Sequence, residues 1–102
     1  METLKKSRQF KKVLQGGSRE KLETIVVCRL PQKEGITRIG ITVSRKAGRS
    51  VERNRIRRRV KEALRRNASF LPESEDIVII AGRRCLEADF KSIEEDIRRL
   101  GK

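Results

Sequence analysis

Residues 76–81 constrain the fold of this chain most strongly, because they form a nearly continuous apolar run. Such a run is expected of a central or parallel strand that is covered on both faces. Only 35% of the 102 residues are hydrophobic and 3% are aromatic, so the core must be small and built mainly from Ile, Val and Leu. This length is enough for one domain and too short for two. The sequence therefore predicts a single domain, 1–102, organised around a strand at 76–81.

Two further strands are predicted on the N-terminal side of this run. Residues 24–30 and 36–43 are rich in Ile, Val and Thr, which favour strands, and a polar turn at 31–35 separates them. These two strands most simply pair with each other as a hairpin. A short segment at 18–21 is expected to pair beside them.

Short helices are predicted near both ends of the chain. Ser7 can cap a helix that Gly16 ends, and Asp89 can cap a last helix that Gly101 ends. Both helices carry apolar residues at helical spacing, namely Phe10, Val13 and Leu14 in the first and Phe90, Ile93, Ile97 and Leu100 in the last. We assign Phe70 and Phe90 to the core.

A longer central helix is expected from residue 50 to residue 67. At 3.6 residues per turn its apolar side is formed by Ile56, Val60, Ala63, Leu64 and Asn67. Arg53 projects toward that side from the first turn, whereas most other arginines fall opposite. The predicted order αβββαβα corresponds to an α+β fold, with helices packed on a small four-stranded mixed sheet.

Arginine is concentrated between residues 44 and 59, over the end of a strand, a glycine turn and the first turns of the central helix. The whole chain carries 27 Lys and Arg against 14 Asp and Glu, a formal net charge of +13. Like charges this close repel one another, and a polyanion relieves the repulsion because each neutralised phosphate releases a counterion. The planar guanidinium fork suits phosphates and stacked bases. The composition therefore predicts nucleic-acid binding.

Other functional classes are disfavoured by residues that the chain lacks. With no histidine, it cannot build an imidazole triad or a His-ligated zinc site. The acidic residues show no pairing typical of a two-metal nuclease, and we expect them to be solvated. Cys28 and Cys85 are isolated among apolar neighbours and are interpreted as buried thiols, with no disulfide or metal site. Without a signal peptide or a spanning apolar run, we expect a cytoplasmic protein with no membrane contact.

The basic motif resembles a known family. The pattern G-x-x-V-S-R-K-x-G-x-x-V-x-R-N-R-I-x-R, from Gly40 to Arg58, closely resembles the signature of the bacterial ribonuclease P protein subunit. Phe10, Gly16 and the strand at 76–81 fit the same family in order and spacing, so the resemblance spans almost the whole chain.

The resemblance implies a function in which RNA performs the chemistry. The family's catalytic RNA removes the 5′ leader of precursor tRNA, so the holoenzyme is an endoribonuclease to which the protein supplies no catalytic residue. Mg²⁺ is the expected cofactor, bound mainly by the RNA, with no metal held tightly by the protein. The expected partners are the catalytic RNA and the leader, with no small-molecule substrate. The family fold also implies a left-handed crossover around the central helix, against the usual right-handed rule.

Site residues follow from the same resemblance. The residues expected to face the catalytic RNA are Arg45, Lys46, Arg49, Arg53, Asn54, Arg55, Arg57 and Arg58. The residues expected in a leader cleft between the first helix and the sheet are Phe10, Val13, Leu14, Cys28 and Arg38, with the outward residues of the strand at 24–30. Leu14 and Cys28 stand where related proteins often carry aromatics, so base stacking would depend mainly on Phe10.

Two alternatives to this function remain open from the sequence. A ribosomal or architectural RNA-binding protein without a part in catalysis is compatible with the composition. A DNA-binding regulator is less compatible, because base reading in the major groove uses mixed polar side chains, whereas this helix offers mainly arginine.

Overall fold

The computed structural model describes residues 2–101, which form a five-stranded mixed sheet and four α-helices. The strands are β1 (Glu2–Thr3), β2 (Ser18–Lys21), β3 (Ile25–Pro31), β4 (Arg38–Val43) and β5 (Glu75–Ala81). The helices are α1 (Ser7–Gly16), α2 (Ser50–Arg66), α3 (Arg84–Glu87) and α4 (Phe90–Arg99), with short 3₁₀ turns η1 (Arg45–Ala47) and η2 (Ala68–Phe70). The α+β class is confirmed.

The strand order β1-β4-β5-β3-β2 places β5 at the centre of the sheet, as its apolar run predicts. β5 is parallel to β4 and antiparallel to β3. The predicted hairpin between β3 and β4 is therefore wrong, because β5 lies between them. A strand that is apolar on both faces is best accommodated in the middle of a sheet, where both of its edges are also paired. The pairing of β2 with β3 is confirmed.

The chain crosses from β4 to its parallel neighbour β5 through α2. The handedness of this crossover stays a prediction. The expected four strands become five because β1 pairs in parallel with β4 at Arg38 and Ile39. β1 is two exposed residues long, too short to give a periodic signal in the sequence.

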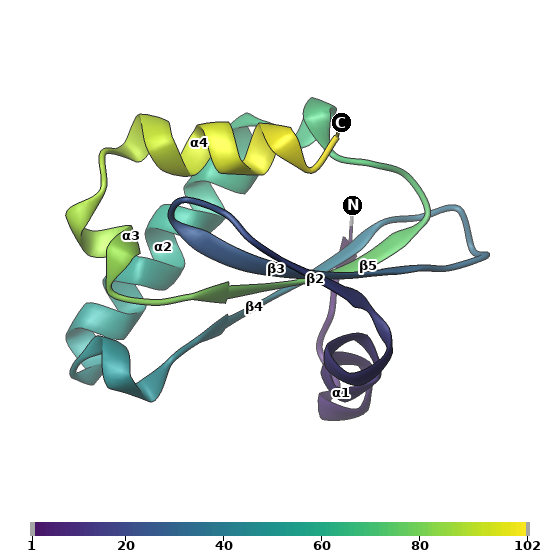
Figure 1. Ribbon diagram of the computed structural model, residues 1–102, viewed down its shortest axis with the longest axis horizontal. Helices are drawn as coiled ribbons and strands as arrows, with labels where there is room; N and C mark the ends of the chain where they lie inside the picture. Colours follow the sequence, from purple (N-terminus) through teal and green to yellow (C-terminus); the bar gives the residue numbers. More distant parts are fainter. Residues whose placement is uncertain (1, 102) are drawn as a thin grey trace.

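Helices cover one face of the sheet far more completely than the other (Figure 1). We call the face that carries Ile39, Ile77 and Ile79 the closed face, because α2, α3 and α4 pack over it. Its core includes sixteen buried residues, and Ile56 and Val60 of α2 are fully buried there. Each buried Ile or Val side chain stabilises the fold by about 1.5–3 kcal/mol.

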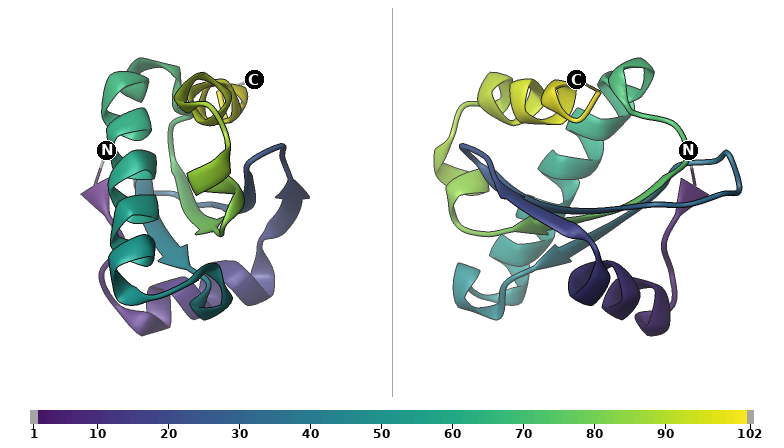
Figure 2. Two further views of the ribbon diagram at one scale, coloured as in Figure 1. Left: turned by 90° about the vertical axis from the view of Figure 1, so that its left-hand side faces the viewer. Right: turned by 45° about the vertical axis from the view of Figure 1, so that its right-hand side comes forward.

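The opposite face, which carries Cys28, Gly40 and Val78, is covered by α1 alone, and we call it the open face. Four buried residues form its core, namely Leu4, Val13, Cys28 and Val78. Ile80 and Phe10 are only partly buried there. In both views of Figure 2, α2 spans the height of the molecule, from the level of α1 at its N-terminal end to the level of α4 at its C-terminal end.

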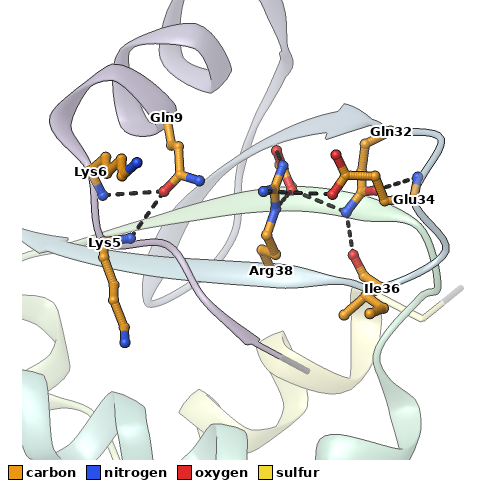
Figure 3. Close-up of polar contacts among 8 residues, drawn as sticks. Lys5, Lys6, Gln9, Gln32, Glu34, Ile36 and Arg38 are labelled. Carbon is orange, nitrogen blue, oxygen red and sulfur yellow. Dashed lines mark hydrogen bonds and ion pairs between the residues drawn. The ribbon is translucent and has the colours of Figure 1, made fainter.

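The predicted span of the central helix is confirmed by α2, and its predicted apolar side is buried. Asn67 is buried with it and donates to the Ala63 carbonyl and the Glu94 carboxylate. α1 begins at Ser7 as expected, although Ser7 is the first helical residue and Lys6 is the cap. The Gln9 side chain accepts from the backbone N–H groups of Lys5 and Lys6, which fixes the entry into α1 (Figure 3).

Two assignments of side chains to core or solvent are wrong. Phe70 is 48% exposed, because η2 turns it away from the core, and Arg98 lies over its ring at 5.2 Å. Asp76 and Asp96 are buried, although we expected solvated carboxylates. Both accept hydrogen bonds from a distant part of the chain, Asp76 from Arg38 and Asp96 Oδ2 from Thr24. The other Asp96 oxygen, Oδ1, is buried without a hydrogen-bond partner among the described residues.

Cys28 and Cys85 are free and buried, as predicted, one on each side of the sheet. Burial raises the pKa of the Cys85 thiol, whose sulfur donates to the Thr24 carbonyl. In the described part of the chain, none of the helices combines the length and apolar character that a membrane crossing requires.

Candidate nucleic-acid interface

The basic motif folds as the end of β4, the turn η1 and the first half of α2. The Ser44 hydroxyl accepts from the Lys46 backbone N–H and starts η1. Gly48 then adopts φ 142°, a conformation that favours glycine. A Cβ atom there would lie 2.8 Å from the Glu52 carboxylate, so glycine also makes room for the group that caps α2.

Glu52 fixes the start of α2. Its carboxylate accepts from the Arg49 backbone N–H at 3.1 Å and from the Arg83 guanidinium at 3.2 Å. These two hydrogen bonds, the backbone one first, lower the pKa of Glu52. The negative charge also suits the positive end of the helix dipole. The N-terminal half of α2 is therefore held in place by groups other than its own arginines.

The eight residues expected to face RNA lie together on η1, at the N-cap Arg49 and on the N-terminal half of α2. Arg55 and Arg58 are exposed, and Arg57 is half-buried and donates to the Asn54 side chain at 3.1 Å. Within residues 2–101, none of the seven cations in this set forms an ion pair. The set is Arg45, Lys46, Arg49, Arg53, Arg55, Arg57 and Arg58, and we call it the unpaired cations.

Arg53 differs from its neighbours, as its position on the helical wheel predicts. The residue is half-buried, and its Nε atom is buried without a hydrogen-bond partner among the described residues. An unsatisfied buried donor costs about 1–3 kcal/mol. The guanidinium therefore has unused hydrogen-bonding capacity.

Two arginines in the C-terminal half of α2, Arg65 and Arg66, are neutralised by a carboxylate of the same helix. Glu62 accepts from Arg65 and Arg66, and these hydrogen bonds lower its pKa to about 2. Arg59 donates to the carbonyls of Leu86 and Ala88 and so anchors the C-terminal end of α3. Charge that is available to an anion is thus concentrated at the N-terminal half.

A groove of about 700 Å³ lies between α1, β4 and α2, where the open face meets the outer edge of β4, and we call it the α1 groove. Its cationic lining comes from Lys5, Arg8, Lys11 and Arg57, and its apolar lining from Phe10, Leu14, Ile41 and Val43. Arg57 belongs to the unpaired cations, so the basic helix and the groove meet at this residue.

Gly40 positions the Phe10 ring in this groove. A Cβ atom at Gly40 would lie 2.4 Å from Phe10 Cζ, closer than real contacts allow, and 3.1 Å from Leu4 Cβ, which is a tight contact. The absence of a side chain on β4 therefore lets the ring lie directly on the strand. Phe10 stays partly exposed, as base stacking would require.

Three of the five expected cleft residues do not line the α1 groove. Val13 and Cys28 are 0% and 1% exposed, because α1 packs directly on β3, so neither side chain reaches the surface of the groove. The Arg38 guanidinium forms two 2.8 Å hydrogen bonds with Asp76, which raise the pKa of Arg38. Figure 3 shows Arg38 beside the β3–β4 loop, near Glu34 and Gln32.

Phe10 and the 39% exposed Leu14 do line the groove. Sequence reasoning missed Lys5, Arg8, Lys11 and Thr42, which also line it. Arg8 and Lys11 could have been found, because they follow helical spacing beside Phe10 and Leu14. Thr42 could not have been found from the sequence, because its exposure depends on where α1 ends over the sheet. Among residues 2–101, no three Cys, Asp or Glu side chains gather closely enough to hold a metal ion.

Comparison with known proteins identifies relatives over the full chain. The family model for Ribonuclease P matches residues 1–102. The chain is 37% identical over 99 residues to the ribonuclease P protein component of Caldanaerobacter subterraneus subsp. tengcongensis, covering 97% of this chain and 85% of that protein. It is 39% identical over 100 residues to the corresponding protein of Clostridioides difficile, and the match covers 97% of this chain and 88% of that protein.

Solved structures agree with this similarity. The ribonuclease P protein of Thermotoga maritima superposes with a TM-score of 0.81 at 30% identity and 97% coverage of each chain. That of Staphylococcus aureus superposes with a TM-score of 0.83 at 27% identity, covering 100% of this chain and 96% of the other.

Proposed function

The chain belongs to the bacterial ribonuclease P protein family, and we propose that it is the protein subunit of a ribonucleoprotein that removes the 5′ leader of precursor tRNA. The observation that carries this proposal is the junction of the unpaired cations with the α1 groove at Arg57. In this function a catalytic RNA and its Mg²⁺ ions perform the hydrolysis. The protein binds and orients RNA in the bacterial cytoplasm, where precursor tRNA is made, and supplies no reacting group.

The unpaired cations are the proposed contact with the catalytic RNA. Arginine forks bind phosphate oxygens in a bidentate manner, and these arginines have no carboxylate partner within residues 2–101. Arg53 is half-buried and its Nε atom is buried, so only the rest of its side chain could meet an external anion. The internal ion pairs of Arg65 and Arg66 make these two residues weaker candidates.

The α1 groove is the proposed contact with the single-stranded leader. Phe10 offers a stacking surface, and base–aromatic stacking stabilises binding by about 1–3 kcal/mol per base. Lys5, Arg8 and Lys11 would follow the leader phosphates along the groove. Val13 and Cys28 support α1 from below, and Arg38 holds the end of β4, so their proposed roles are structural.

The test is cleavage of precursor tRNA by a bacterial ribonuclease P RNA at low Mg²⁺, with and without the protein. The protein is expected to stimulate cleavage, because added cations reduce the Mg²⁺ needed to hold RNA and substrate together. Arg55→Ala should weaken stimulation, whereas Arg19→Ala, on the exposed edge strand β2 far from α2, should leave it unchanged. Tight RNA binding without stimulation would instead support an architectural RNA-binding role.

A further inference from the structure

The outer edge of β4 is only half covered by β1. The Leu4 N–H donates to the Ile39 carbonyl at 3.0 Å, so Ile39 directs its main-chain polar groups toward β1. On the other side, the Ser44 N–H donates to the Ala81 carbonyl of β5 at 3.0 Å. Because alternate residues of a strand direct their peptide groups to the same side, Ile41 and Val43 direct theirs to the outer edge.

β1 ends at Thr3, opposite Ile39, so no strand reaches Ile41 or Val43. Within residues 2–101 the main-chain groups of this edge have no backbone partner. An unpaired strand edge presents a row of donors and acceptors that can pair with another molecule.

A second groove, of about 530 Å³, adjoins this edge between β1 and the C-terminal half of α2, and we call it the β1 groove. Leu4, Ile39 and Leu64 form an apolar floor. The volume lies in the range of ligand pockets, about 300–1,000 Å³. Phe10, Ile41 and Arg57 line both this groove and the α1 groove, so the two are continuous over the free edge of β4.

The rim of the β1 groove is positively charged. Arg57, Lys61 and Arg65 follow one another at four-residue spacing along α2, over about 12 Å of helix. Arg65 is paired with Glu62, so the free charge of the rim comes from Arg57 and Lys61. Glu2 is the one acidic residue in the described lining. Lys61 is exposed and forms no ion pair within residues 2–101. An apolar floor beneath a cationic rim matches a nucleotide, which has a flat base and an anionic phosphate.

We propose that the β1 groove is a second nucleotide site, which takes one base of the single-stranded leader after the leader turns over the free edge of β4. This inference rests on the proposed function, because it continues the leader path from the α1 groove. The base lies on Leu4, Ile39 and Leu64, and its polar edge meets the main-chain N–H and C=O of Ile41. Lys61 binds the adjoining phosphate.

The matched variants are Ala68→Phe and Ser69→Phe. Ala68 is exposed and lines the β1 groove but not the α1 groove, so a phenyl group there fills the proposed site. Ser69 is the next residue, is also exposed and lies outside both grooves. In a second pair, Lys61→Ala removes an exposed charge at the rim of the β1 groove, and the control Lys91→Ala removes an exposed charge on α4.

The experiment measures the affinity of the reconstituted holoenzyme for precursor tRNAs whose leaders lengthen from one to ten nucleotides. Wild type, Ser69→Phe and Lys91→Ala should gain affinity as the leader lengthens. Ala68→Phe should lose affinity several-fold with the longest leader and lose none with the shortest, because the phenyl group keeps one base of a long leader off the apolar floor. Lys61→Ala should show a smaller loss with the same dependence on leader length.

Unchanged affinities for Ala68→Phe and Lys61→Ala across the series would overturn the β1 groove proposal alone. The proposal would also fail if Ala68→Phe lost the same affinity at every leader length, or if Ser69→Phe lost as much affinity as Ala68→Phe. If wild type showed no dependence on leader length, the leader-binding part of the proposed function would fail, and this inference with it.

Discussion

The closed and open faces of the sheet are built from the same strands but differ in how far they are covered. β5 sends Ile77 and Ile79 to the closed face, where three helices bury them completely. It sends Val78 and Ile80 to the open face, where α1 buries Val78 and leaves Ile80 partly exposed. Because side chains alternate along a strand, β5 contributes to a fully buried core on one side and to a partly exposed surface on the other. The proposed leader path uses the exposed side, so a ligand there would leave the core of the closed face undisturbed.

The largest expected effect comes from a cavity on the closed face. Ile79→Ala should lower the free energy of unfolding by about 2–5 kcal/mol, because a buried Ile→Ala change removes apolar contacts and leaves a void. Leu14→Ala on the open face should cost far less stability, since Leu14 is 39% exposed, and should weaken leader binding. Urea unfolding checks both variants. Equal destabilisation by the two would contradict the division between faces.

Asp96 supports the closed face through a polar contact. Its Oδ2 atom accepts from the Thr24 backbone N–H at 2.7 Å and from the Thr24 hydroxyl at 2.6 Å, and this ties α4 to the start of β3. Asp96→Ala would leave two buried donors without an acceptor and should destabilise the protein by about 2–3 kcal/mol. Thermal unfolding measures the loss, and RNA affinity measured well below the melting temperature should not change. A loss of RNA affinity under those conditions would place Asp96 in the binding surface.

The two halves of α2 give a sharper test of binding. Arg55→Ala should weaken binding to the catalytic RNA and reduce the slope of log affinity against log salt by about 0.7–0.9, because one phosphate contact is lost. Arg66→Ala should change the slope less, since Glu62 already neutralises Arg66. Both slopes are obtained by measuring the affinity of each variant for the catalytic RNA over a series of salt concentrations. A larger change in Arg66→Ala would refute the account of the unpaired cations.

The smallest effect is a pH dependence that comes from Glu62. Its pKa is lowered to about 2 in the folded protein from an ordinary value of 4.5. The ion pairs therefore contribute stability above pH 4.5, and this stability is lost as the pH falls toward 2. Glu62→Gln should melt slightly below wild type at neutral pH, and the difference should shrink from pH 4.5 downward. A difference that stayed constant over this range would show that Glu62 acts by packing.

Elements with a strong local signal could be predicted from the sequence. The apolar run of β5 and the 3.6-residue period of α2 each identify an element and its buried side without any knowledge of neighbours. The partner of β4 could not be predicted, because a turn at 31–35 favours a hairpin locally, whereas the pairing with β5 is fixed by packing on both sides of the sheet. β1 escaped notice because two exposed residues carry no periodicity.

The sequence predicted which residue types make up the candidate site better than it predicted which of their side chains are exposed. The unpaired cations form a continuous segment, so their clustering followed from the sequence alone. Exposure of Phe10, Val13 and Leu14 depends on how α1 lies on β3, and the helical spacing they share does not distinguish the buried Val13 from the exposed Leu14. The ion pair of Arg38 with Asp76 joins residues 38 positions apart, and no local pattern indicates it.

The most direct test of the central claim is the affinity of the holoenzyme for precursor tRNA and for mature tRNA, measured for wild type and Phe10→Ala. If the open face holds the leader, wild type prefers the precursor, and Phe10→Ala loses about fivefold or more in precursor affinity while its affinity for mature tRNA is unchanged. A loss that is equal for both RNAs would show that Phe10 serves the fold, and the open face would then not be the binding surface for the leader.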